Sequence, residues 1–190
     1  QTVAFELAEQ TPQPIDHVFC PAGGGGLCVA MARGFGQLVK TGQLEKTPAV
    51  ECVQPEGNDT IARPLRDGAT KAREVACTTK VSGLQVASVV DGHLAIECCR
   101  ASGGTGHLVS DEFVWAVQRR LAREEGIFSE PAGAVALAGA LQAAERSEVE
   151  RDATIVCMVT GSGFKDDAAV DRINADVECP LVDAEAIDAW

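Results

Sequence analysis

The sequence predicts an α/β fold in which helices cover both faces of a parallel sheet. Three observations lead to this prediction. Strand-like apolar runs at residues 17–20, 49–53 and 152–160 alternate with helical stretches, which is the element order of parallel sheets. The centre of the last run is continuously apolar, as is typical of a buried strand. Four glycines, residues 23–26, lie between the first strand and the helix that follows it.

The composition limits the classes of partner. A chain of 190 residues with 46% hydrophobic residues is long enough to bury one substantial core. Its net charge of −12 argues against nucleic acids and anionic membranes as partners. No apolar stretch reaches membrane-spanning length, and the first residues do not resemble a signal peptide. We therefore expect a cytoplasmic protein.

Eight cysteines raise the question of disulfides or a metal site. They form no CxxC pair, and only three histidines accompany them. Several lie in apolar strand-like runs, where a free thiol behaves as a small hydrophobic side chain. We expect reduced, mostly buried thiols and no metal site. The cysteines are Cys20, Cys28, Cys52, Cys77, Cys98, Cys99, Cys157 and Cys179.

The glycine run is the strongest local signal for a ligand. A helix start carries backbone N–H groups without intrahelical partners, and its dipole favours a negative charge. Glycines allow a phosphate to approach the backbone closely because no Cβ stands in the way. The sequence therefore predicts a phosphate site at Gly23, Gly24, Gly25 and Gly26.

Other interpretations of the glycine run remain open at this stage. A P-loop requires Lys and Ser or Thr after the last glycine, but Leu27 and Cys28 stand there. A dinucleotide fingerprint fits the glycine spacing poorly, although Glu51 or Glu56 offers an acidic partner. A strand-to-helix turn without any ligand is the structural alternative.

Capping signals predict most of the remaining helices. Gly42 is suited to end a helix, Ser110 to cap the start of one, and Pro131 to occupy a first helical position. Residues 61–76 hold the densest basic patch, which we interpret as a solvated loop. Helices are expected at residues 2–10, 27–40, 89–100, 110–124 and 131–144.

Six segments, in the same order, resemble the fold type II pyridoxal-phosphate (PLP) enzymes of the threonine synthase and threonine dehydratase type, within the tryptophan synthase beta-like superfamily. Each is weak alone, but together they extend over most of residues 1–170. The most specific are PAGGGGL, EGIFSEPAGA and VTGSGFKD. The six segments are residues 1–6, 21–27, 102–105, 110–112, 125–134 and 159–166.

The resemblance implies a fold and a cofactor. Residues 1–170 would form the C-terminal part of a three-layer αβα PLP-binding domain that is incomplete at its N-terminus, and residues 171–190 an acidic tail or packing segment. Gly23–Gly26 would hold the cofactor phosphate, and the Thr160 hydroxyl would face the pyridine nitrogen. For Glu130 we favour a structural role at the helix start over a place in the site.

One departure from the family pattern affects function. The family holds PLP on a Schiff-base lysine well before the glycine loop, and no such residue precedes Gly23 here. Lys165 follows a Phe, as the family lysine does in its own motif, but its position matches the family's C-terminal segment instead. We therefore expect no catalytic residue within this chain.

The resemblance supports three hypotheses. The first is that the chain is the cofactor-binding part of an enzyme that eliminates or replaces a β or γ substituent of an amino acid. This part would be inactive alone, whether or not it binds PLP. It would act as a homodimer or with a complementary N-terminal part. The second is a noncatalytic binding or assembly module. The third is part of a β-replacing synthase, because residues 82–86 and 91–93 depart from ordinary threonine synthases.

Overall fold

The computed structural model describes residues 1–178 and 181, and its centre is a four-stranded sheet. The strands are β1 (His17–Pro21), β2 (Ala49–Pro55), β3 (Gly106–Val109) and β4 (Ile155–Cys157). Their order across the sheet is β3-β2-β1-β4, and every neighbouring pair is parallel. The prediction of a parallel sheet is confirmed.

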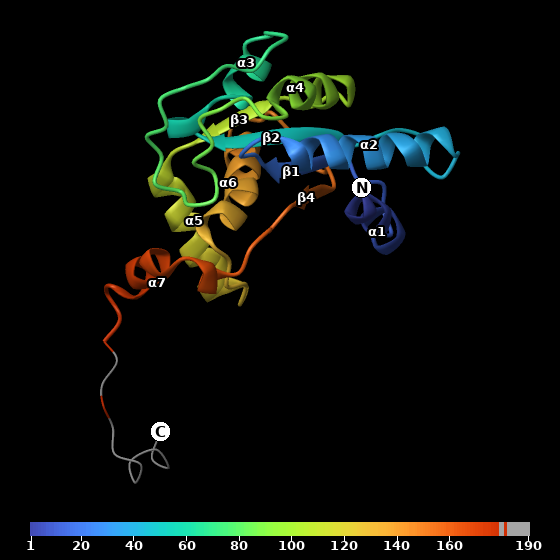
Figure 1. Ribbon diagram of the computed structural model, residues 1–190. Helices are drawn as coiled ribbons and strands as arrows, with labels where there is room; N and C mark the ends of the chain where they lie inside the picture. The colour runs from blue at the N-terminus through green and yellow to red at the C-terminus, as the bar shows by residue number, and fades with distance from the viewer. Residues whose placement is uncertain (179–180, 182–190) are drawn as a thin grey trace.

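Helices cover both faces of this sheet, so the fold has three layers (Figure 1). One hydrophobic core joins α1, α2 and α4 to the first face. A second core joins α5 and α6 to the opposite face. The helices are α1 (Thr2–Gln10), α2 (Gly26–Lys40), α3 (Ala62–Arg66), α4 (Gly92–Ala101), α5 (Asp111–Glu124), α6 (Pro131–Glu145) and α7 (Asp167–Asn174), with short 3-10 turns η1 (Glu56–Asn58) and η2 (Gly163–Lys165).

The predicted capping signals act as expected. The Ser110 hydroxyl accepts a hydrogen bond from the Phe113 N–H at 3.2 Å, which satisfies one free donor at the start of α5. Pro131 occupies the first position of α6, a helix in which most residues are buried between the sheet and α5. Gly42 has a positive φ directly after the end of α2.

One strand prediction was wrong, and one strand was not predicted. Residues 152–160 do not form one buried strand, because only Ile155–Cys157 pair, and all three are half-buried. β4 lies at the edge of the sheet and pairs with β1 alone, which explains its partial exposure. β3 was not predicted at all: its four residues follow a glycine-rich turn and are too few for a periodic signal.

The basic patch at residues 61–76 was only partly understood from sequence. Its four basic side chains, Arg63, Arg66, Lys71 and Arg73, are exposed, as expected of a solvated segment. The patch is not simply a loop, however, because its first residues form α3, and the apolar face of this short helix is buried. Tertiary burial of Ile61 and Leu65 explains the helix.

The C-terminal segment is described in part. Helix α7 crosses the predicted boundary between residues 170 and 171, and the Arg172 guanidinium lies 4.1 Å from the centre of the Trp115 ring on α5. Most of residues 171–190 lie outside the described residues, so the predicted acidic tail stays a prediction. Within the described part of the chain, no helix is long and apolar enough to cross a membrane.

Candidate functional site

The sheet has a topological switch point between β1 and β4. The chain leaves the carboxyl end of β1 into α2 on one face, and it leaves the carboxyl end of β4 towards α7, which contacts α5 on the other face. The two connections therefore diverge beyond the carboxyl ends of these neighbouring parallel strands. In open α/β sheets ligands bind in this position. The glycine loop directly follows β1, and residues 158–163 directly follow β4.

The glycine loop places its four amides around the start of α2. Gly25 is the N-cap of the helix and has a φ of +95°, a conformation that favours glycine. A Cβ on Gly25 would lie 2.8 Å from Cβ of Ala95 on α4, so the backbone packs too closely for a larger residue. Among residues 1–178 and 181, none of the four glycine N–H groups donates a hydrogen bond. These amides are therefore without a partner in this part of the chain, with Gly26 exposed, Gly23 and Gly24 half-buried and Gly25 buried.

A loop from residue 81 to residue 91 packs along the glycine loop. A Cβ on Gly23 would lie 3.1 Å from Cγ2 of Val86, and one on Gly24 would lie 3.1 Å from Cβ of Val90. The buried Asn58 side chain holds this loop by donating hydrogen bonds to the carbonyl oxygens of Leu84 and Val86, each at 2.9 Å. The loop forms one wall of the candidate site.

Thr160 lies at the end of the β4 segment, beside the strand that leads into the glycine loop. The Met158 N–H donates to the carbonyl oxygen of Phe19 on β1 at 3.0 Å, so the two segments stay paired up to that point. Thr160 itself is exposed. Thr160 is thus at the same carboxyl edge as the glycine loop and exposed to solvent.

Glu130 fixes the turn that follows Thr160. Its N–H donates to the carbonyl oxygen of Gly161 at 2.9 Å, and a Cβ on Gly161 would overlap the Glu130 carboxylate. The carboxylate is almost buried and pairs with Nζ of Lys165 at 3.4 Å. Glu130 therefore holds the backbone of the turn next to Thr160, in agreement with a structural role.

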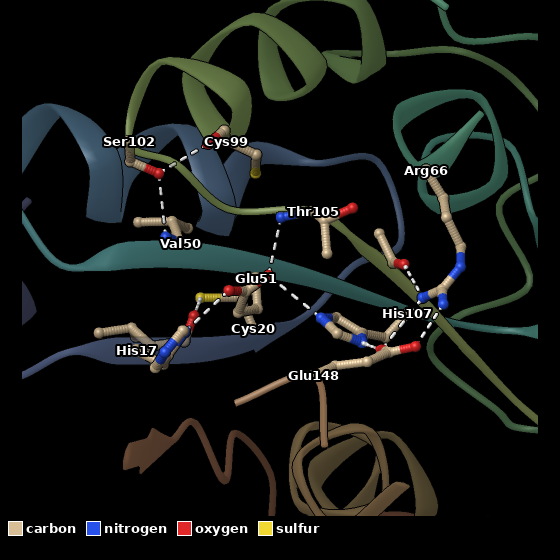
Figure 2. A network of polar contacts seen from close by, with 12 residues as sticks. His17, Cys20, Val50, Glu51, Arg66, Cys99, Ser102, Thr105, His107 and Glu148 are labelled. Carbon is tan, nitrogen blue, oxygen red and sulfur yellow. Dashed lines mark hydrogen bonds and ion pairs between the residues drawn. The ribbon is translucent and has the colours of Figure 1, made fainter. Parts of the chain in front are cut away.

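Glu51 lies away from the site, within a chain of ionisable side chains that involves three strands (Figure 2). The carboxylate accepts from His17 Nδ1 at 2.9 Å, His107 Nε2 at 3.1 Å and the Thr105 N–H at 2.7 Å. Burial raises the pKa of this carboxyl, but these hydrogen bonds outweigh burial and hold the pKa below its usual value. Its oxygens are already used, so Glu51 does not act as the acid of a dinucleotide site.

The contacts of His107 and His17 continue from Glu51 to the loop between α6 and β4. His107 Nδ1 lies 3.5 Å from a Glu148 carboxylate oxygen, and Glu148 in turn pairs with Arg66. The other end of the chain is His17 Nε2, which lies 3.3 Å from Glu150. We call these six residues, Arg66, Glu148, His107, Glu51, His17 and Glu150, the charge chain. It lies near the amino ends of β1 and β3, opposite the glycine loop.

Four of the cysteines lie together in the core between the sheet, α2 and α4. Cys20, Cys28, Cys52 and Cys99 are buried, and all seven cysteines in the described part of the chain are free thiols. Cys179 lies outside the described residues. Cys157 is only partly buried, contrary to the expectation of a fully buried strand, yet burial raises the pKa of its thiol to about 12. No group of three metal-ligating side chains is placed to hold a metal ion among residues 1–178 and 181.

The fold and this edge define an α/β protein with a glycine-rich helix start at the switch point of a parallel sheet. Residues 1–161 match the family described as "Pyridoxal-phosphate dependent enzyme", and the chain belongs to this family. This confirms the resemblance inferred from the six segments.

The similar curated proteins are threonine synthases. The chain is 31% identical to threonine synthase from Methanocaldococcus jannaschii over 189 residues, covering 95% of this chain and 46% of that protein. It is 34% identical to the Methanosarcina acetivorans threonine synthase, covering 100% of this chain and 46% of that protein. The chain thus spans about half the length of these relatives.

Solved structures share the fold. Threonine deaminase isoform 2 from Solanum lycopersicum matches with a TM-score of 0.70 at 23% identity, over 94% of this chain and 48% of that one. An L-serine ammonia-lyase from Rhizomucor miehei matches with a TM-score of 0.70 at 19% identity, over 93% of this chain and 55% of that one. The tryptophan synthase beta-like fold is therefore confirmed.

Sequence reasoning missed the wall formed by residues 81–91. No local pattern marks this segment, which has no regular secondary structure and meets the glycine loop only through tertiary contacts. Val86, Val90 and Asp91 contact the glycine loop, and none of them was predicted to lie there. The departures from ordinary threonine synthases at residues 82–86 and 91–93 were the available signals.

Proposed function

We propose that this chain is the part of a threonine synthase-like enzyme that binds the phosphate and pyridine side of PLP. The observation that carries the proposal is the set of free glycine amides at the switch point. A Cβ at Gly25 would meet Ala95 and Ile61 and displace the backbone, so the close packing of a glycine at this position keeps the amides in place for a group that needs close backbone contact. Family membership and the threonine synthase relatives agree with this assignment.

The proposed roles follow from position. The amides of Gly23, Gly24, Gly25 and Gly26 would bind the phosphate at the positive end of the α2 dipole. The Thr160 hydroxyl would face the pyridine nitrogen, where a neutral partner leaves that nitrogen unprotonated or weakly hydrogen-bonded. Glu130 would keep the neighbouring turn in place. Bound PLP supplies an electron sink for changes at the β or γ carbon of an amino acid.

The lysine that holds the cofactor would come from outside residues 1–190. The relatives are about twice as long as this chain, which leaves room for that contribution. Lys165 is a poor substitute because its Nζ pairs with the Glu130 carboxylate. We therefore propose that this chain alone is inactive and that a complementary N-terminal part completes a cytoplasmic enzyme acting on an amino acid.

Comparison of pyridoxal phosphate with pyridoxal tests the phosphate cradle. We expect the chain to bind pyridoxal phosphate and to bind pyridoxal, which lacks the phosphate, far more weakly. Gly25→Ala should remove this preference, because the added Cβ meets Ala95 and the amides shift. A fluorescence titration measures both affinities. Equal binding of the two compounds by the unaltered chain would contradict the proposal.

Borohydride reduction tests the missing lysine. The isolated chain is reduced in the presence of pyridoxal phosphate and analysed by mass spectrometry. We expect no single lysine to carry a stoichiometric pyridoxal adduct. Lys165→Met is the matched control because it keeps the length of the side chain. A stoichiometric adduct that disappears in Lys165→Met would assign the covalent role to Lys165.

The β4 edge of the sheet offers a surface for association with a complementary part or with a second copy of the chain. β4 is half-buried, and Phe164 and Val159, which follow it, expose apolar surface. Such a sheet edge can accept another strand. We expect light scattering to find the isolated chain self-associated, and a strictly monomeric protein at high concentration would argue against this proposal. A noncatalytic assembly module predicts the same association without any preference for pyridoxal phosphate.

A further inference from the structure

Asp91 stands beside the opening of α2, although it belongs to the segment that leads into α4. Its N–H donates to the carbonyl oxygen of Gly24 at 3.0 Å, and a Cβ on Gly26 would lie 3.4 Å from Asp91 Oδ2. Helix α2 has no acidic residue in its own first turn, and its N-cap is Gly25, which has no side chain. Asp91 therefore brings a negative charge to a helix start that has none of its own.

The Asp91 carboxylate has no partner that would explain its position. Neither oxygen takes part in a hydrogen bond or ion pair with any of residues 1–178 and 181. Asp91 is the N-cap residue of α4, yet its side chain makes no capping hydrogen bond there. The residue is also exposed. Its backbone is thus bound to the glycine loop, while its charge is left unpaired at the edge of the cradle.

The neighbouring residues hold Asp91 in this place. Val90 has a φ of +42°, which β-branched residues rarely adopt, and its side chain packs against Gly24. On the other side, a Cβ on Gly92 would lie 2.7 Å from Cβ of Ala72. The backbone of Asp91 therefore sits between two close contacts and cannot easily move away from the cradle.

We propose that Asp91 determines the specificity of the phosphate cradle by opposing bound anions, so that a free phosphate binds weakly and only a phosphoester with further contacts is held. The inference rests on the proposed function of Gly23–Gly26. Two like charges a few ångströms apart repel each other, and partial exposure reduces this repulsion without removing it. The net charge of −12 adds to the same effect.

The test compares inorganic phosphate binding by the unaltered chain, Asp91→Asn and Glu97→Gln. Asn has nearly the size and shape of Asp and is equally favoured before a helix, so Asp91→Asn removes the charge with little change in structure. Glu97→Gln is the matched control, because Glu97 is an exposed acid later on the same helix α4. By calorimetry we expect Asp91→Asn to bind phosphate about threefold to tenfold more tightly, and Glu97→Gln to bind like the unaltered chain.

Salt dependence separates charge from structure. If repulsion is the cause, the difference in phosphate affinity between Asp91→Asn and the unaltered chain should shrink as ionic strength rises. If a change in loop structure is the cause, the difference should persist. Affinity for pyridoxal, which has no phosphate, should be the same in all three proteins. Asp91→Ser, a second neutral capping residue, should reproduce Asp91→Asn if the Asn variant is poorly folded.

The outcomes distinguish this inference from the proposed function. Equal or weaker phosphate binding by both neutral variants, or a gain that salt does not reduce, would overturn the role of Asp91 and leave the cradle intact. If none of the proteins binds phosphate or pyridoxal phosphate, the proposed function fails and the role of Asp91 fails with it.

Discussion

The two ends of the sheet differ in whether their polar groups have hydrogen-bond partners. In the charge chain, near the amino ends of β1 and β3, each side chain has a partner for a hydrogen bond or ion pair, and the central Glu51 carboxylate accepts three hydrogen bonds. At the carboxyl edge, the four glycine amides and the Asp91 carboxylate have no partners within the described residues. Satisfied groups stabilise a fold, whereas unsatisfied groups are available to a ligand. The difference separates a structural network from a candidate site.

The largest effect on stability is expected from Glu51→Ala. Removing the shared carboxylate leaves two histidines and the Thr105 N–H without their acceptor, at a cost of about 3 kcal/mol in the free energy of unfolding. Urea denaturation measures this cost, and Glu51→Gln is a milder variant of the same shape. Preference for pyridoxal phosphate should be unchanged in any variant that folds. Its loss would show that the two ends of the sheet are coupled.

In contrast to Glu51→Ala, Gly25→Ala should cost less in the free energy of unfolding and should abolish the preference for pyridoxal phosphate over pyridoxal. We expect about 2 kcal/mol, from the positive φ together with the contacts at Ala95 and Ile61. Gly42→Ala is the matched control, because Gly42 also has a positive φ but no atom near the position of its Cβ. It should cost about 1 kcal/mol and leave phosphate binding intact. Similar effects of both variants on binding would contradict a cradle at Gly25.

Ser110→Ala should cost about 1 kcal/mol without affecting phosphate binding. Helix α5 also begins at the carboxyl edge, directly after β3, but its own Ser110 caps it. The variant therefore contrasts a helix start closed by its own side chain with the open start of α2. Thermal denaturation measures the cost. A change in phosphate affinity would mean that the start of α5 also belongs to the site.

The smallest effect is expected from pH. The pKa of Glu51 is lower in the folded chain than its ordinary value of 4.5, because hydrogen bonds from His107, Thr105 and His17 outweigh burial. The stabilisation is therefore fully present above that ordinary value and is lost as pH falls through the folded pKa. Denaturation profiles should show this acid loss in the unaltered chain and a weaker one in Glu51→Gln. Parallel profiles for the two proteins would show that Glu51 does not cause the loss of stability in acid.

The sequence was sufficient for elements with strong local signals. The glycine run after an apolar strand, the Ser110 cap and the Pro131 start each depend on residues within a few positions of one another. These signals reflect backbone conformation and local hydrogen bonds, so they are visible without the fold. They located α2, α5 and α6 and, with the family resemblance, the class of enzyme.

Tertiary structure alone determined the rest. β3 and α3 are too short to show a period, and burial against other elements stabilises them. Glu51 looked like a possible ligand acid until the fold brought two histidines, 34 and 56 residues away, to its carboxylate. Asp91 reached the opening of α2 in the same manner, across more than sixty residues of chain. The sequence by itself determined where backbone amides are left free; only long-range packing decided which charges oppose or satisfy them, because such contacts depend on distance in space and not on distance along the chain.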